Sequence, residues 1–194
     1  MLGTLASAHA DTIFDNFGAG NTYQAGSWEF RGENNISRID RAKSFVPSQS
    51  YSLTSIETAL YWETGDKNFD ISIYSDAGGA PGTALSTFTQ LATAPLGQTI
   101  LYTSAYSGIT LNAGSTYWVV INAASPNSSD GGFWLASSPT DTGFSTFSGG
   151  SWNTSTSGSP VIRVSGTLTA AAPEPASLVL LCLATPLLFR KRHS

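Results

Sequence analysis

The stretch Tyr117-Trp118-Val119-Val120-Ile121 contains no charged or amide side chain. A short run that is apolar on both faces and contains several β-branched residues predicts a strand at the centre of a sheet. A second stretch, Phe69-Asp70-Ile71-Ser72-Ile73-Tyr74, alternates apolar with polar side chains and predicts a strand with one face toward a core. Turn residues fill positions 75–82 after it, where Pro81-Gly82 suits the centre of a type II turn. Both stretches indicate a β protein.

The remainder of residues 11–170 has the same character. Ile162, Val164 and Leu168 alternate with polar residues, and Gly166 among them predicts a β-bulge. Residues 148–159 are rich in Gly, Ser and Thr and predict a loop or a sheet edge. No part of residues 11–170 has a helical period, so the sequence predicts an all-β fold, an antiparallel β-sandwich of jelly-roll type. Further strands are expected at residues 12–17, 43–46, 53–62, 99–106 and 132–137.

Cysteine and histidine are almost missing from the sequence. The chain of 194 residues has one cysteine, Cys182, and two histidines, His9 and His193, and all three lie outside residues 11–170. The body therefore has no residues for a disulfide, a thiolate zinc site, or a Ser-His-Asp or Cys-His catalytic centre. We expect a protein that is not an enzyme and binds no cofactor or metal.

The body of the chain is acidic. The sequence has 13 Asp and Glu and 9 Lys and Arg, and the tail after residue 172 holds Glu174 and three of the basic residues. Residues 1–172 thus carry 12 acidic and 6 basic side chains, which argues against nucleic acid as a partner. Positions 77–172 contain only Asp130, Asp141 and Arg163 as charged residues, a composition typical of extracellular surfaces.

The two ends of the chain have the character of targeting segments. Ala8-His9-Ala10 fits the small-x-small pattern at which a secretory signal peptide is cleaved. We therefore expect residues 1–10 to be the end of a truncated signal peptide, residues 11–170 to be the sandwich domain, and residues 171–194 to be a C-terminal signal.

The C-terminal segment has three parts in order. Pro173-Glu174-Pro175 comes first, an apolar run over 178–189 follows, and Arg190-Lys191-Arg192 closes it. With residues 176 and 177 included, a helix here would rise by roughly 21 Å, against about 30 Å of bilayer hydrocarbon. Basic residues beside a membrane segment resist translocation. The segment therefore predicts a short hydrophobic helix that inserts transiently into a membrane.

This tail resembles a PEP-CTERM sorting signal, the bacterial C-terminal tag that a membrane enzyme of the exosortase type reads and cleaves. The matching residues are Pro173, Glu174 and Pro175, the run Leu178-Val179-Leu180-Leu181-Cys182-Leu183, and Arg190, Lys191 and Arg192. The resemblance implies export, processing by an exosortase-type partner, and a final location at the cell-envelope surface or in the extracellular matrix.

The body, over about residues 12–168, resembles the exported choice-of-anchor domains, type R in particular. The similarity rests on Ala42-Lys43-Ser44-Phe45, Tyr51-Ser52-Leu53-Thr54-Ser55-Ile56, Ile73-Tyr74-Ser75-Asp76, Gly79-Ala80-Pro81-Gly82 and Leu111-Asn112-Ala113-Gly114-Ser115-Thr116-Tyr117-Trp118-Val119-Val120. It implies a surface or matrix location and brings no catalytic residue. Together, the two targeting segments and the resemblance of the body lead us to expect a non-catalytic exported protein of the cell surface or extracellular matrix.

An alternative function is that of a carbohydrate-binding module for extracellular polysaccharide. The chain has five tryptophans, and exposed aromatic rings stack on sugar rings. Trp118 is expected in the core because its neighbours are apolar. Trp134 and Trp152 lie among Gly, Ser and Asp and are the candidate glycan contacts.

Three other groups of residues are weaker candidates for a functional site. Oxygen ligands for calcium are available at Asp11, Asp15, Asn16, Asp66, Asp70, Asp76 and Asp130, but without the spacing of a calcium loop. A glycosidase pair would have to come from the aspartates or from Glu29, Glu33, Glu57 and Glu63. A loose basic group, Arg31, Arg38, Arg41 and Lys43, is interrupted by Glu33 and Asp40 and is interpreted as a solvated face.

Overall fold

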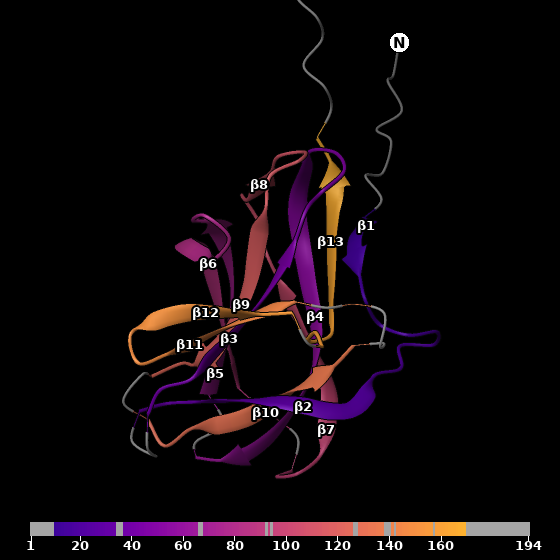
Figure 1. Cartoon of the computed structure of the whole chain (residues 1–194). Coiled ribbons are helices and arrows are strands. Elements are labelled where there is room, and N and C mark those ends of the chain that lie inside the picture. Colours follow the sequence, from indigo (N-terminus) through magenta and orange to yellow (C-terminus); the bar gives the residue numbers. More distant parts are fainter. Residues whose placement is uncertain are drawn as a thin grey trace, which may run out of the picture.

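Thirteen β-strands form the regular structure of this chain in the computed structural model (Figure 1). The structure describes residues 10–33, 37–65, 68–91, 93, 95–125, 128–137, 141, 143–156 and 158–169. All strand pairs are antiparallel, and no helix occurs in this described part. The strands are β1 (Asp11–Asp15), β2 (Gln24–Arg31), β3 (Asp40–Phe45), β4 (Tyr51–Thr64), β5 (Asn68–Asp76), β6 (Pro81–Leu91), β7 (Thr99–Ala105), β8 (Thr110–Leu111), β9 (Tyr117–Ala123), β10 (Gly131–Ala136), β11 (Phe144–Ser148), β12 (Ser151–Ser155) and β13 (Ile162–Leu168).

The seven-stranded sheet is organised by β4, its 14-residue strand. On one side β4 pairs with β7 and β8. On the other side its first part pairs with β13, whose outer neighbour is β1, and its last part pairs with β10, whose outer neighbour is β2. The sheet is therefore forked, and an isolated bridge between Ala136 and Pro160 marks the point where β10 and β13 meet.

The six-stranded sheet has the order β12-β11-β3-β9-β5-β6. All seven residues of β9 are buried, and β9 lies between β3 and β5, which confirms the central strand predicted from its apolar run. The predicted bulge is confirmed as well, because the register of β13 against β4 shifts between Ser165 and Gly166. A Cβ at Gly166 would lie 2.6 Å from the carbonyl oxygen of Ser52, so the close approach requires glycine.

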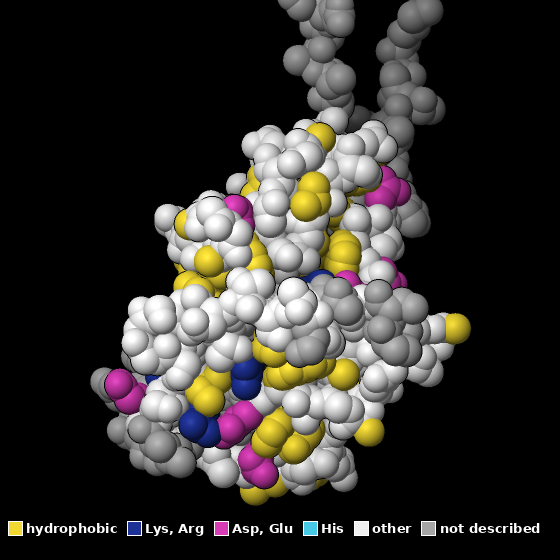
Figure 2. Space-filling view, in the orientation of Figure 1, with side chains coloured by type: hydrophobic (Ala, Val, Ile, Leu, Met, Phe, Trp, Pro, Cys, Tyr) yellow, Lys and Arg dark blue, Asp and Glu magenta, His cyan; other side chains and the backbone are white. Residues whose placement is uncertain are grey.

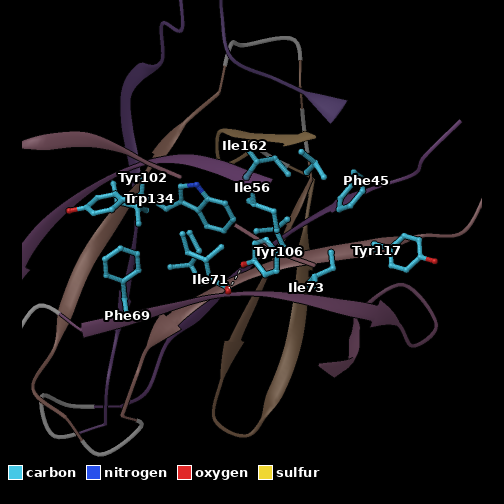
Figure 3. Close-up of a cluster of buried hydrophobic side chains, with 14 of the residues drawn as sticks. Phe45, Ile56, Phe69, Ile71, Ile73, Tyr102, Tyr106, Tyr117, Trp134 and Ile162 are labelled. Carbon is cyan, nitrogen blue, oxygen red and sulfur yellow. Dashed lines mark hydrogen bonds between the residues drawn. The ribbon is translucent and has the colours of Figure 1, made fainter. Parts of the chain in front are cut away.

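The main core fills the space between the two sheets (Figure 3). Alternation along β5 points Phe69, Ile71 and Ile73 into it, as the sequence predicted. Rings from both sheets meet there, for example Phe69 and Tyr102 edge to face with centroids 5.0 Å apart. The Tyr106 hydroxyl donates to the carbonyl oxygen of Ile71 at 2.6 Å, so this buried phenol is satisfied (Figure 3). The chain is thus an antiparallel β-sandwich.

The turn between β5 and β6 lies within the predicted residues 75–82, but its centre differs from the prediction. Its central residues are Gly78 and Gly79, with φ of 70° and 90°, and Ala77 N donates to Ala80 O at 2.8 Å. Two-residue hairpins need positive φ at both central positions, which glycine adopts without strain. The prediction of a turn centred on Pro81-Gly82 is therefore wrong, and Pro81 begins β6.

The first described strand begins, and the last described strand finishes, at the same end of the sandwich. Asp11, at the start of β1, pairs with Gly166, near the end of β13 (Figure 1). The helix predicted at 178–189 and the sorting residues in 173–175 and 190–192 lie outside the described residues. Within the described part, no helix has the length and apolar character needed to cross a bilayer.

Candidate functional site

The outer face of the six-stranded sheet carries polar and aromatic side chains together. Paired residues of neighbouring strands point to the same side, so the register identifies this face. Its side chains are Asp40, Ala42 and Ser44 of β3, Trp118, Val120 and Asn122 of β9, Asp70, Ser72 and Tyr74 of β5, Ser145 and Phe147 of β11, and Trp152 and Thr154 of β12.

The β11–β12 hairpin curls across this outer face (Figure 1). Trp152 packs against the small cluster of Ala42, Trp118 and Val120, although β12 is the edge strand. Thr154 Oγ1 donates to the carbonyl oxygen of Gly79, in the β5–β6 turn, at 3.4 Å. Because β12 and β5 are four places apart in the strand order, these contacts require strong curvature. The outer face is therefore concave.

Trp118 anchors the covered part of this face. It is 4% exposed, which confirms that it is a core residue, and its Nε1 donates to Asp76 Oδ1 at 2.7 Å. This hydrogen bond, together with backbone N–H donors of the β5–β6 turn, lowers the pKa of Asp76. Trp118 thus holds the turn to the sheet and is not available to a ligand.

The uncovered part of the face is built around the ion pair of Arg38 and Asp40. Arg38 Nε and Nη2 both donate to the Asp40 carboxylate, with an Nη2–Oδ2 distance of 2.6 Å. The side chain of Asp40 is only 4% exposed, and burial raises its pKa more than Arg38 lowers it. The Arg38 guanidinium carbon lies 5.4 Å from the centroid of the Phe147 ring, a cation–π geometry.

Tyr74 adds a phenol to the same group. Burial raises its pKa first, and the negative charge of Asp40 raises it further, whereas Arg38 acts in the opposite direction. Its hydroxyl has no hydrogen-bond partner among the described residues. The Asp40 carboxylate, the Arg38 guanidinium and the Tyr74 hydroxyl therefore form a compact set of acceptors and donors beside aromatic rings.

A pocket of about 330 Å³ lies at the end of this face. It is formed where the β2–β3 connection meets the turn of the β11–β12 hairpin, and it is lined by Glu33, Ser37, Arg38, Phe147, Gly149 and Gly150. Figure 2 shows basic and acidic side chains together between the β11–β12 hairpin and β2, next to apolar side chains, and further acidic side chains in the upper half of the view. The pocket is small, at the lower end of the range for ligand sites.

Two of the four basic residues that the sequence placed on a solvated face lie on the inner side of a strand instead. The Lys43 side chain is 5% exposed, and its Nζ lies 3.1 Å from Asp141 Oδ1. Arg41 donates to the carbonyl oxygen of Glu29 at 2.6 Å and to Thr146 Oγ1. Alternation places Arg41 and Lys43 on the inner side of β3, because they pair with the inward-facing Ile121 and Val119. The solvated interpretation is wrong for these two residues.

Asp141 also accepts hydrogen bonds from two side chains near the ends of the domain. Its Oδ2 accepts from Asn16 Nδ2 and from Ser159 Oγ, the latter at 2.8 Å. Asn16 in turn accepts from the Ile162 backbone N–H at 2.6 Å. We name the group of Asn16, Lys43, Asp141 and Ser159 the clasp, because it connects four segments that are far apart in the sequence.

The tryptophans predicted as glycan contacts have different environments. Trp134 is fully buried in the main core, and its Nε1 donates to the Val161 carbonyl oxygen at 2.8 Å. The prediction for Trp134 is therefore wrong: even positions of β10 point inward, and its glycine and serine neighbours do not alter that direction. Trp152 is half-buried and forms a T-shaped contact with Phe147, with centroids 5.5 Å apart. Its role in glycan contact stays a prediction.

The carboxylates considered for calcium or glycosidase chemistry are largely engaged elsewhere. Glu29 is paired with Arg31, and Asp15 and Glu57 are both paired with Arg163. Asp66 lies outside the described residues. Among the described residues, no group of three or more His, Cys, Asp or Glu has the geometry of a metal site.

Sequence reasoning did not select Arg38, Asp40, Tyr74 and Phe147 as site residues. The sequence did contain a signal that Arg38 and Asp40 lie together, because residues two apart in an extended segment point to the same side. Phe147 had no such signal, because its place on the face depends on pairing with Asp40, 107 positions away.

Comparisons with known proteins add little. No protein-family model matches the sequence, and no curated protein matches it either. One solved structure that matches is titled "Structure of infectious bursal disease virus Gx strain", with 14% sequence identity and a TM-score of 0.22. The match covers 93% of this chain and 48% of that chain, so this chain spans about half the length of its neighbour. A similarity this weak supports no conclusion about function.

Proposed function

We propose that this chain is a non-catalytic exported protein of a bacterial cell-envelope surface or extracellular matrix, sorted through its C-terminal segment. The observation that carries the proposal is the order of Pro173-Glu174-Pro175, the apolar run and Arg190-Lys191-Arg192 a few residues after the last strand. The start of β1 and the end of β13 lie at the same end of the sandwich, so a tether there would leave the outer face and pocket accessible. A jelly-roll arrangement of the sandwich belongs to the same proposal.

The chemistry of the segment explains how sorting would proceed. The apolar run inserts into the membrane, and Arg190, Lys191 and Arg192 remain on the cytoplasmic side. Proline disfavours the helical region for the residue before it, so Pro173 and Pro175 would favour an extended segment in the proposed sorting step. An extended segment outside the membrane suits the active site of an exosortase-type processing enzyme, which is the proposed partner.

Intact-mass analysis of the protein from its native host tests the proposal. We expect a mature species that ends at or near residues 173–175. Replacing Arg190, Lys191 and Arg192 with serine should reduce retention at the membrane and processing. The matched control exchanges Arg and Lys at the same three positions and keeps the charge, and it should be processed normally. A mature chain that still ends at Ser194 would contradict the proposal.

A second function, binding of extracellular polysaccharide, is favoured by one specific observation. The concave outer face places Trp152, Phe147 and Tyr74 beside the hydrogen-bonding groups of Arg38 and Asp40. Aromatic rings next to fixed polar groups are what a site for sugar rings requires, since each sugar has an apolar face and a rim of hydroxyl groups. Retention in a polysaccharide matrix would then follow from binding after sorting.

A further inference from the structure

We propose that the pocket between the β2–β3 connection and the β11–β12 turn binds an uncharged sugar residue of a polysaccharide. This inference rests on the second proposed function and assigns it a position and a ligand class. The pocket is lined by Glu33, Ser37, Arg38, Phe147, Gly149 and Gly150. The two tryptophans predicted from the sequence as glycan contacts, Trp134 and Trp152, are not among these lining residues.

The apolar wall of the pocket is rigid. Phe147 pairs directly with Asp40 of β3 on one side and with Trp152 of β12 on the other. The Trp152 contact at 5.5 Å and the Arg38 contact at 5.4 Å hold its ring in place. A fixed aromatic side chain binds the apolar face of a sugar with little loss of conformational freedom.

The polar groups of the pocket suit hydroxyl groups. Arg38 uses Nε and Nη2 for Asp40, and its Nη1 has no partner among the described residues. Glu33 supplies a carboxylate acceptor and Ser37 a hydroxyl group. Gly149 and Gly150 have φ of 62° and 86°, and a Cβ built at either would meet nothing within 4 Å. A ligand can therefore approach the backbone of this turn.

The charges of the pocket select against anionic sugars. Asp40 already neutralises Arg38, and Glu33 adds a negative charge at the pocket rim. Residues 1–172 as a whole are acidic as well, with 12 acidic and 6 basic side chains. A uronic acid or a sulfated sugar would meet like charge, which disfavours binding. A neutral hexose meets only donors, acceptors and an aromatic wall.

The test is affinity electrophoresis of the full chain in gels that contain one polysaccharide each. Laminarin, galactomannan and soluble starch are the neutral probes, and alginate and polygalacturonate are the anionic ones. We expect retardation by at least one neutral probe and none by the anionic probes. Phe147→Ala should weaken that binding by about tenfold or more, since removal of a central aromatic contact usually costs this much.

Matched variants separate the pocket from the fold. Phe133, half-buried on the outer face of the other sheet, stacks on Tyr61 and does not line the pocket, so Phe133→Ala removes the same kind of side chain from another face and should bind like the wild type. Glu33→Gln changes an exposed pocket residue without removing packing, and should weaken binding several-fold with an unchanged melting temperature.

Four outcomes would overturn the inference. Retardation by the anionic probes alone contradicts the ligand class, and equal losses in Phe147→Ala and Phe133→Ala contradict the location. Binding that survives Phe147→Ala and Glu33→Gln but is lost in Trp152→Ala leaves polysaccharide binding in place and moves it away from the pocket. No retardation by any probe rejects both the pocket and the second function, while the mass analysis still decides on sorting.

Discussion

Asp141 and Asp40 are both largely withdrawn from solvent, yet the two regions around them treat a carboxylate in opposite ways. In the clasp, burial alone would raise the pKa of Asp141, but hydrogen bonds from Asn16 and Ser159 and the charge of Lys43 outweigh it, so this pKa is lowered. On the outer face, burial raises the pKa of Asp40 and Arg38 does not compensate fully. The clasp thus stabilises the charged form of Asp141, whereas the outer face disfavours the charged form of Asp40.

The difference distinguishes structure from site. The Asp141 carboxylate accepts from three side chains that belong to separate parts of the sequence, so the clasp holds the first strand against the last. Asp40 has Arg38 as its ion-pair partner and is buried on the concave outer face, beside Arg38 at the pocket. A charge that is costly for the fold and placed beside a pocket suits a binding role better than a structural one.

The largest effect is expected from breaking the clasp. Asp141→Asn removes the carboxylate that pairs with the buried Lys43 ammonium, and breaking an ion pair with a buried partner typically costs about 3–5 kcal/mol of unfolding free energy. The matched control is Asp15→Asn, which removes one carboxylate from the more exposed Arg163 pair and should cost less than about 1 kcal/mol. Urea denaturation of the three proteins measures both changes, and equal losses would show that the clasp is not special.

Two tryptophans of the outer face should differ in the same experiment. Trp118→Ala removes a buried side chain and its bond to Asp76, and should cost about 3–5 kcal/mol. Trp152 is half-buried on the edge hairpin, so Trp152→Ala should cost about 1 kcal/mol, near the average for a point substitution. Equal losses at the two positions would mean that Trp152 is packed as tightly as the buried Trp118.

The smallest change, and the one of opposite sign, is expected at Asp40. Its raised pKa means that the charged form is disfavoured in the folded state, so this residue contributes stability below the unfolded value of 3.8 and loses it as pH rises through the folded pKa. Asp40→Asn should therefore leave the unfolding free energy at pH 7 unchanged within about 1 kcal/mol, or raise it.

The pH dependence sharpens this contrast. Asp141 has a lowered pKa, so it contributes stability above 3.8, and that contribution disappears as pH falls through the folded pKa. The cost of Asp141→Asn should therefore shrink between pH 7 and pH 3, while any gain from Asp40→Asn should also vanish there. Denaturation curves at both pH values test the two signs, and a cost of Asp141→Asn that grows on acidification would contradict the assignment.

Much of the fold could be predicted from single strands. The alternation along β5 and β13 and the apolar run of β9 are strong local signals, and each element lies where it was expected. The prediction missed β2, β6 and β11, which are short of large apolar residues or mix them with Gly, Ser and Thr. It gave residues 148–159 as a loop or a sheet edge, and β12 in this range is the edge strand of its sheet. In such strands, pairing with a neighbour supplies the stability that the side chains do not, so the sequence contains little local signal.

The candidate site was predicted less well, for a related reason. Trp134 and Trp152 have similar neighbours in the sequence, but one points into the core and the other lies on an outer face. Lys43 belongs to a group of basic residues that suggested a solvated face, yet it points inward to Asp141, 98 positions away. No local pattern distinguishes these cases, because both depend on which side of a sheet is covered.

The sequence by itself determined the class of fold, the central strand, the bulge at Gly166 and the burial of Trp118, because all of these follow from the alternation and size of side chains within a few residues. The tertiary structure alone decided which tryptophan is a surface residue, that the buried Lys43 pairs with Asp141, and that Arg38, Asp40, Tyr74 and Phe147 share one face. These outcomes depend on strand pairing between distant segments and on the curl of the β11–β12 hairpin. Long-range pairing of this kind leaves no trace within a window of a few residues.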